Sequence, residues 1–297
     1  MDLKILYRGP LDSCNYGCVY CPFAKKVDSR EELRADRLAL ERFTAWVSSR
    51  TQDRIGVLIT PWGEGLIRPW YQEALAALSH LPNVDRAVIQ TNLSCRLDWV
   101  SACDKERLAL WATYHPEWVP RARFVAKVRD LARQGVRLSC GAVGFNHFVD
   151  EIEALRAEIP PEIYLWINAV KGEGEGYYAE SDVLRFERID PLFRVNGEHH
   201  PSLGRSCRAG ASVFAVDGEG TMRRCHFIRE VIGNIYEPGF EGALRERACT
   251  RATCGCHIGY VHLDYLELGK VFGAGILERI PERPIQIMRS ASRISHS

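Results

Sequence analysis

The sequence predicts an α/β protein that begins with a partial (β/α)6 TIM barrel. Two observations predict it: six short runs that are apolar throughout, and intervening stretches in which apolar residues recur at helical spacing. Strands that are apolar on both faces are typical of a parallel sheet covered by helices. Six strand-and-helix units form an arc that is open relative to the eight-stranded barrel.

The six apolar runs are the expected strands of this barrel. They lie at residues 3–7, 56–60, 86–90, 108–113, 136–141 and 164–170. Helices are expected between them because apolar residues recur three or four positions apart. The residues that show this spacing are Leu75, Leu78 and Leu81, then Phe124, Val128 and Leu131, then Val149, Ile152, Leu155 and Ile159.

The pattern changes after residue 170, which indicates a second, smaller unit. Glycine-rich and loop-like segments mark a boundary between residues 171 and 200. We therefore expect the barrel over residues 1–195 and the smaller unit over 196–297. Within the second unit, residues 212–225 predict a hairpin, and residues 238–249 and 260–277 are expected to be helical.

The charge balance argues against nucleic acid and membrane partners. Lys and Arg number 39 against 38 Asp and Glu, a net charge of +1, so the chain of 297 residues has no global basic field. The N-terminus lacks the features of a signal peptide, and no apolar run reaches the roughly 18 residues of a membrane span. We expect a cytoplasmic protein.

The chain has 11 cysteines, and most of them fall in two groups near its two ends. Cytosolic thiols are kept reduced, so a disulfide framework is disfavoured and metal binding is the leading interpretation.

The first group is Cys14, Cys18 and Cys21, in a C-x3-C-x2-C arrangement. It directly follows the first expected strand, on the face of such barrels where chemistry occurs. A 4Fe-4S cluster that only transfers electrons is held by four thiolates. Three thiolates leave one iron open for another ligand.

This arrangement, with Tyr20 before the last cysteine, resembles the signature of the radical S-adenosylmethionine (radical SAM) enzymes. The resemblance implies that Cys14, Cys18 and Cys21 bind a 4Fe-4S cluster whose open iron binds S-adenosylmethionine. It also implies a flavodoxin- or ferredoxin-type reductant, and reductive cleavage of the cofactor to a 5'-deoxyadenosyl radical that abstracts hydrogen from a substrate. A zinc site with a remote fourth ligand is the alternative for these three cysteines.

The segment after the second strand, TPWGEGL, resembles the Gly-Gly-Glu-Pro-like segment that holds the cofactor's ammonium group in this family. Gly63 and Glu64 match it, whereas Trp62 and Gly65 depart from it. Gly63 permits close approach of the backbone to the cofactor, and the acid Glu64 suits the ammonium cation. We therefore expect both residues to bind the cofactor.

Polar residues at other strand ends are further candidates. Tyr20, Asn92 and Asn168 are expected to contact the cofactor or the substrate. His115 and Glu117, which follow the fourth strand, are candidates for catalytic proton transfer.

The second group is Cys207, Cys225, Cys249, Cys254 and Cys256. The hairpin followed by a cysteine-rich stretch resembles the SPASM and Twitch extensions of radical SAM enzymes, and five cysteines fit the shorter Twitch form with one auxiliary 4Fe-4S cluster. Four thiolates would suffice, and the sequence leaves open which cysteine is not a ligand. A structural zinc on four of these thiols, with His226 and His257 adjacent, is the alternative.

The expected reaction is a two-electron oxidation of a small biosynthetic intermediate, assisted by the auxiliary cluster. Because the first strand begins at residue 3, we expect no N-terminal leader-peptide-binding domain, which favours a small molecule as substrate. A peptide-modifying maturase that forms cross-links or thioethers is the alternative. A zinc-stabilised binding module and an iron-sulfur electron carrier are more remote.

Overall fold

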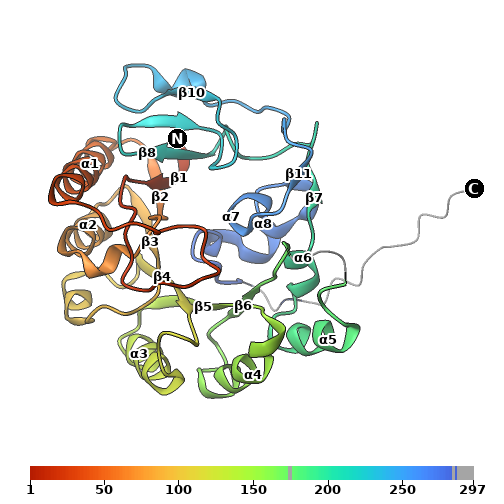
Figure 1. The fold of residues 1–297 in the computed structure, drawn as a ribbon. Coiled ribbons are helices and arrows are strands. Elements are labelled where there is room, and N and C mark those ends of the chain that lie inside the picture. The colour runs from red at the N-terminus through yellow and green to blue at the C-terminus, as the bar shows by residue number, and fades with distance from the viewer. Residues whose placement is uncertain (173–175, 283–284, 286–297) are drawn as a thin grey trace, which may run out of the picture.

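A sheet of nine strands organises the molecule (Figure 1). The computed structural model describes residues 1–172, 176–282 and 285. The first six strands pair in chain order and in parallel, which confirms the predicted barrel strands. They are β1 (Asp2–Arg8), β2 (Arg54–Ile59), β3 (Val84–Thr91), β4 (Leu108–Tyr114), β5 (Arg137–Val143) and β6 (Leu165–Asn168).

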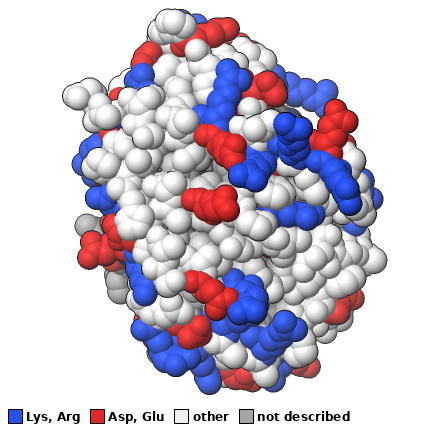
Figure 2. All heavy atoms as spheres, turned by 90° about the vertical axis from the view of Figure 1, so that its left-hand side faces the viewer, with Lys and Arg blue, Asp and Glu red and all other residues white. Residues whose placement is uncertain are grey.

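Five helices follow these strands and cover the outer side of the arc (Figure 1). They are α1 (Arg30–Ser49), α2 (Pro69–His80), α3 (Arg121–Arg133), α4 (Val149–Glu158) and α5 (Glu180–Ile189). The apolar spacing predicted α3 correctly, since Phe124, Val128 and Leu131 are all buried. Acidic and basic side chains are interspersed over the outer surface seen in Figure 2. No helix among the described residues has the length and apolar character that crossing a membrane requires.

The predicted hairpin is confirmed, and it joins the barrel's own sheet. Strands β8 (Val213–Asp217) and β9 (Thr221–Arg223) pair antiparallel, and β10 (Val231–Asn234) pairs with β9. Strand β8 also pairs in parallel with β1, which gives the order β10-β9-β8-β1-β2-β3-β4-β5-β6. The predicted division near residue 195 stays a prediction, and part of the predicted second unit, 283–284 and 286–297, lies outside the described residues.

Two helix predictions in the second unit are wrong. Residues 238–249 contain one short 3-10 turn, Phe240–Ala243, because the segment that follows is held extended. The guanidinium of Arg224 donates to the carbonyl oxygens of Arg247 and Ala248, at 2.6 Å each. Those bonds, and one from Cys249 N to Arg205 O, replace helical hydrogen bonds.

The predicted helix over residues 260–277 is broken into short pieces. Helix α7 (His257–Tyr260) and helix α8 (Leu268–Phe272) are separated by residues 261–267, which contain the 3-10 turn Asp264–Leu266 and end at Glu267, whose φ of 51° is left-handed and interrupts regular helix. Two further short elements, α6 (Phe193–Gly197) and β7 (His200–Pro201), lie in a loop-like segment, and β7 pairs antiparallel with β11 (Thr253–Cys254).

The C-terminal segment fills the inner side of the arc (Figure 1). Tyr260, Leu268 and Phe272 pack against inward-facing strand residues such as Trp111 and Trp166. Successive strand residues point to opposite faces, so one set meets the outer helices and the other meets this segment. This double burial explains why the strands are apolar throughout.

Truncation of Phe272, which is fully buried in this inner core, tests its contribution. Phe272→Ala should lower the free energy of unfolding by about 3 to 5 kcal/mol, because it removes apolar contacts and leaves a cavity. Denaturant titration followed by circular dichroism measures the change. The control Leu38→Ala, at a side chain that is 54% exposed on α1, should change stability by less than about 0.5 kcal/mol. Equal effects of the two substitutions would contradict the assignment of an inner core.

Candidate functional site

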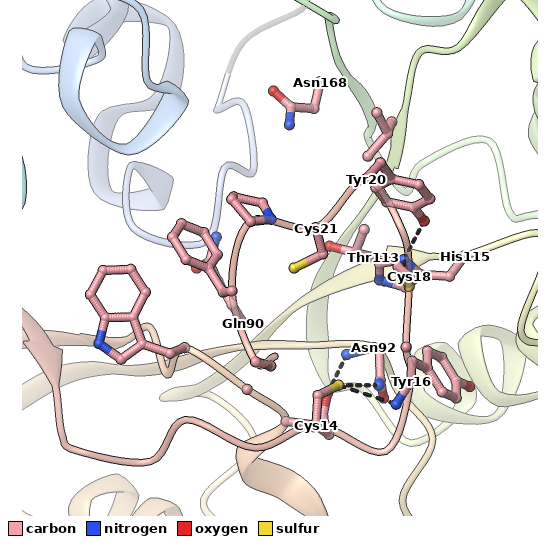
Figure 3. Close-up of a pocket in the computed structure, with 18 of the residues that line it drawn as sticks. Cys14, Tyr16, Cys18, Tyr20, Cys21, Gln90, Asn92, Thr113, His115 and Asn168 are labelled. Atoms are coloured by element: carbon pink, nitrogen blue, oxygen red, sulfur yellow. Dashed lines mark hydrogen bonds between the residues drawn. The ribbon is translucent and has the colours of Figure 1, made fainter. Parts of the chain in front are cut away.

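The first cysteine group lines a cavity of about 410 Å³ at the carboxyl end of the barrel strands. The loop between β1 and α1 carries Cys14, Cys18 and Cys21 around this cavity (Figure 3). The other walls come from the ends of β3, β4, β5 and β6, because parallel strands bring their carboxyl ends to one edge. The strand-end residues that line it are Gln90, Thr91, Asn92, Thr113, His115, Val143, Phe145, Trp166 and Asn168.

Each end of the cysteine loop has its own contacts. The backbone N–H of Tyr16 and the side-chain amide of Asn92 approach the Cys14 Sγ at 3.4 and 3.7 Å, and the same amide donates to Asn15 Oδ1 at 3.1 Å. The Cys18 Sγ lies 3.5 Å from His115 Nδ1. The strand ends therefore hold the loop in position over the sheet.

Gly63 allows the loop after β2 to touch the cysteine loop directly. A Cβ at position 63 would lie 1.8 Å from the carbonyl oxygen of Ser13, so no larger residue fits without moving backbone. The next residue makes a hydrogen bond at the same contact, from Glu64 N to Ser13 O at 3.2 Å. The predicted close backbone approach at Gly63 is therefore made to the residue before Cys14.

The Glu64 carboxylate is buried and accepts bonds from protein groups. Its Oε1 accepts from Leu66 N at 3.0 Å and from Thr91 Oγ1 at 2.7 Å, and its Oε2 accepts from Asn92 N at 2.5 Å. Burial raises the pKa of Glu64 to about 7, although these bonds act in the opposite direction. The structure thus gives Glu64 a role in holding the end of β3, beside which Asn92 contacts Cys14.

His115 stands beside Tyr20 in the cavity wall (Figure 3). The Tyr20 hydroxyl lies 2.7 Å from His115 Nδ1, and burial lowers the pKa of His115 to about 4. The imidazole is therefore neutral at neutral pH, and its tautomer sets whether Nδ1 accepts from the hydroxyl or donates to it. Asn168 lines the same cavity with an exposed side chain.

Glu117 is exposed and lies outside the lining of this cavity. The chain turns after His115, whose carbonyl oxygen accepts from Trp118 N and Val119 N. That turn takes Glu117 to the surface, so the structure does not group it with the other predicted site residues.

All five cysteines of the second group line a second cavity, of about 390 Å³. They come from the segment before β8, the end of β9, and the residues around β11. The sequence spacing thus correctly grouped Cys207, Cys225, Cys249, Cys254 and Cys256. The two neighbouring histidines, His226 and His257, do not line it.

The five thiols differ in what surrounds them. Burial raises the pKa of Cys207 to about 11, and the charges of Cys225 and Cys249 add to the shift. Burial raises the pKa of Cys254 to about 12, and the charges of Cys256, Cys225 and Cys207 add to it. Burial also raises the pKa of Cys256, but the backbone N–H groups of α7 and the charges of Arg8 and Lys171 oppose that shift.

Within the described part of the chain, no three His, Cys, Asp or Glu side chains are grouped closely enough to hold a single metal ion.

Two residues at the edges of these cavities were not anticipated from the sequence. Arg8 ends β1, and Lys171 follows β6 closely. A cation directly after a buried apolar run is the signal that could have found them, because such positions face the functional end of a parallel sheet.

The fold is shared with solved structures of anSMEcpe. Native anSMEcpe with bound AdoMet (S-adenosylmethionine) matches with a TM-score of 0.53 and 13% identity, over 81% of this chain and 82% of that chain. The same protein with AdoMet and the Cp18Cys peptide matches with a TM-score of 0.51 and 11% identity, over 81% of each chain. BtrN in complex with AdoMet and 2-DOIA gives a TM-score of 0.36 at 15% identity, over 82% of this chain and 86% of that chain, which is too low to support a shared fold. No family model and no curated protein sequence matches the chain.

The raised pKa of Glu64 makes a prediction about pH. The folded chain keeps this proton between about pH 4.5 and 7, where the unfolded chain has lost it. The free energy of unfolding should therefore fall across this range, by on the order of 3 kcal/mol more in the wild type than in Glu64→Gln, whose side chain does not titrate. Urea denaturation of both proteins between about pH 5 and 8 measures the difference. Parallel pH profiles would contradict a raised pKa.

Proposed function

We propose that this chain is a radical S-adenosylmethionine enzyme that uses the first cavity to bind a 4Fe-4S cluster and the cofactor. The observation that carries the proposal is the loop of Cys14, Cys18 and Cys21 at the carboxyl end of a partial barrel. The similarity in fold to anSMEcpe, which binds AdoMet, supports the same assignment.

The residues present fit such a group. Three thiols face one cavity, and three thiolates leave one cluster iron open for the cofactor. The cavity also has room beside the thiols and carries polar strand-end side chains that suit a zwitterionic ligand. When bound, the cluster and the cofactor would supply a low-potential electron and a carbon radical that abstracts hydrogen from the substrate.

The chain's own residues orient these groups. Gly63 and Glu64 join the cysteine loop, the loop after β2 and the end of β3 through buried backbone contacts. We propose that Glu64 acts by positioning Asn92, with Tyr20, Asn92 and Asn168 in contact with the cofactor or the substrate. His115, held neutral by burial, is the proposed proton acceptor in this cavity.

We propose that the second cavity holds one auxiliary 4Fe-4S cluster on Cys207, Cys225, Cys249 and Cys254. Two features support this choice of four. Besides burial, the charges of Cys225 and Cys249 raise the pKa of Cys207, and those of Cys225 and Cys207 raise the pKa of Cys254. Cys256 also raises the pKa of Cys254, but its own thiol meets the backbone N–H groups of α7 and the charges of Arg8 and Lys171.

The proposed reaction is a two-electron oxidation of a small molecule, for which an auxiliary cluster in the second cavity would supply the acceptor of the second electron. The adjacency of the two cysteine-lined cavities supports it, because a short distance favours electron transfer from a substrate radical. Modification of a peptide is the second candidate, and the binding of the Cp18Cys peptide by anSMEcpe favours it. Deuterium transfer from labelled candidate substrates into 5'-deoxyadenosine distinguishes the two.

Replacement of the first group tests the proposal. Cys14→Ala, Cys18→Ala or Cys21→Ala should abolish cleavage of S-adenosylmethionine by the anaerobically reconstituted, dithionite-reduced protein, because each removes a cluster ligand. About four iron atoms per chain should remain in the second site. Cys103→Ala, at a buried thiol outside both cavities, is the control and should cleave normally. Cleavage retained in the loop variants would contradict the proposal, as would a colourless protein that binds zinc and no iron.

The ligand assignment in the second cavity has a separate test. The wild type and Cys256→Ala should each hold about eight iron atoms per chain, whereas the double variant Cys225→Ala/Cys249→Ala should hold about four. Iron and acid-labile sulfide analysis gives these values. Loss of about four iron atoms from Cys256→Ala would show instead that Cys256 is a ligand.

A further inference from the structure

The two cavities adjoin where the ends of β1 and β6 face each other across the inner side of the arc. Val170 lines the first cavity, and the next residue, Lys171, lines the second. On the other side, Trp62 lines the first cavity while the guanidinium of Arg8 stacks on its ring, 4.0 Å from the centroid. The boundary between the cavities therefore carries two cations.

The guanidinium of Arg8 uses its Nε donor, and its Nη1 and Nη2 donors have no acceptor among the described residues. Its Nε donates to Thr60 O at 2.8 Å and to Thr60 Oγ1 at 3.2 Å, and its ring contact with Trp62 holds the plane of the group. Among the described residues, no carboxylate lies within ion-pair distance of Arg8, and neither Nη1 nor Nη2 makes a hydrogen bond. Burial lowers the pKa of Arg8 to about 10, so it remains charged at neutral pH.

Among the described residues, Lys171 has one hydrogen-bond acceptor. Its Nζ donates to Gly255 O at 2.5 Å and lies 5.3 Å from the centre of the Tyr260 ring. Burial lowers its pKa, and the charges of Cys256, Cys254 and Glu198, in that order, oppose the shift. The Glu198 side chain is 67% exposed, and within the described ranges it forms no ion pair with Lys171.

The two cations approach the second cysteine group from two sides. Arg8 donates to Thr60 Oγ1, which lies 3.2 Å from Nε2 of His226, the residue after Cys225. Lys171 donates to the carbonyl oxygen of Gly255, between Cys254 and Cys256. Partly buried cations are costly unless an anion compensates them, and Arg in particular presents paired donors to carboxylates and phosphates. An arrangement with two fixed cations and free donors is therefore suited to an anionic ligand.

We propose that Arg8 and Lys171 bind an anionic group of the substrate, a carboxylate or a phosphate, at the boundary between the two cavities. This inference rests on the proposed function and adds the substrate's charge to it. Lys171 lines the second cavity and not the first. The proposed anion site is therefore separate from Cys14, Cys18 and Cys21, which are expected to hold the cluster that binds S-adenosylmethionine. An anion held there would keep the substrate between the two proposed clusters.

Calorimetric titration of the bare anions tests the site. Inorganic phosphate and succinate are titrated, at low ionic strength, into the anaerobic holoenzyme saturated with S-adenosylmethionine. At least one of them should bind at one site per chain. Its affinity should fall about tenfold or more in Arg8→Gln and in Lys171→Gln, because each loses a charge-assisted hydrogen bond. Which anion binds more tightly distinguishes a phosphate from a carboxylate.

Matched variants distinguish loss of the positive charge from loss of folding as the cause of weaker anion binding. Arg8→Lys and Lys171→Arg keep the charge and should retain more affinity than the two glutamine variants, although Arg8→Lys loses the paired donors of the guanidinium. Arg54→Gln removes a cation at the opposite end of the strands, exposed and paired with Asp85, and should not change binding. Iron content and circular dichroism of every variant should match the wild type.

The results that would contradict the anion site differ from those that would contradict the proposed function. The inference is wrong if neither anion binds the wild type, or if Arg8→Gln and Lys171→Gln bind as the wild type does. It is also wrong if these variants lose affinity for S-adenosylmethionine to the same extent, or change only the potential of the auxiliary cluster. In each case, cleavage of S-adenosylmethionine by the wild-type protein would still support the proposed function.

Discussion

The contact between Gly63 and the Ser13 carbonyl holds the candidate site together. It lets the loop after β2 lie directly on the cysteine loop, and it leaves no space for a side chain. The adjacent Glu64 then extends the contact into the sheet, since its carboxylate accepts from Thr91 and from the backbone of Asn92. Two residues thereby join three strand ends, and the position of Cys14 depends on all three.

The second constraint is the way the C-terminal segment fills the inner face of the arc. Its apolar residues pack on the inward side chains of the strands, while buried Glu278 pairs with Arg86 and Arg137 at the other end of the barrel. The same segment begins at Cys256, beside Arg8 and Lys171. Packing of the inner core and placement of the second cysteine group are thus consequences of one chain segment.

The barrel strands and both cysteine groups could be predicted from the sequence because their signals are local. Runs apolar on both faces indicate buried parallel strands, and the spacing of Cys14, Cys18 and Cys21 lies within one loop. The parallel pairing of β8 with β1 could not be predicted, since it depends on contacts between residues more than 200 positions apart. The broken segment after His257 follows from the shape of the inner face, which apolar spacing alone does not describe.

Single side chains were predicted less well than groups. Glu64 lines the first cavity, and its contact with a cofactor cation stays a prediction; its bonds to Leu66, Thr91 and Asn92 could not be predicted, because a turn residue can point either way. Glu117 follows His115 closely in sequence, yet the intervening turn separates them. Arg8 and Lys171 are distant in sequence, and the fold brings both near the second cysteine group, Arg8 through Thr60 and His226 and Lys171 through Gly255.

The proposed function requires an iron-sulfur cluster in the first cavity with one iron open to S-adenosylmethionine. Electron paramagnetic resonance of the reduced, anaerobic protein, with and without the cofactor, tests this requirement. Adding the cofactor should change the g-values of the cluster signal that depends on Cys14, Cys18 and Cys21. A cluster signal that is identical with and without the cofactor would contradict it.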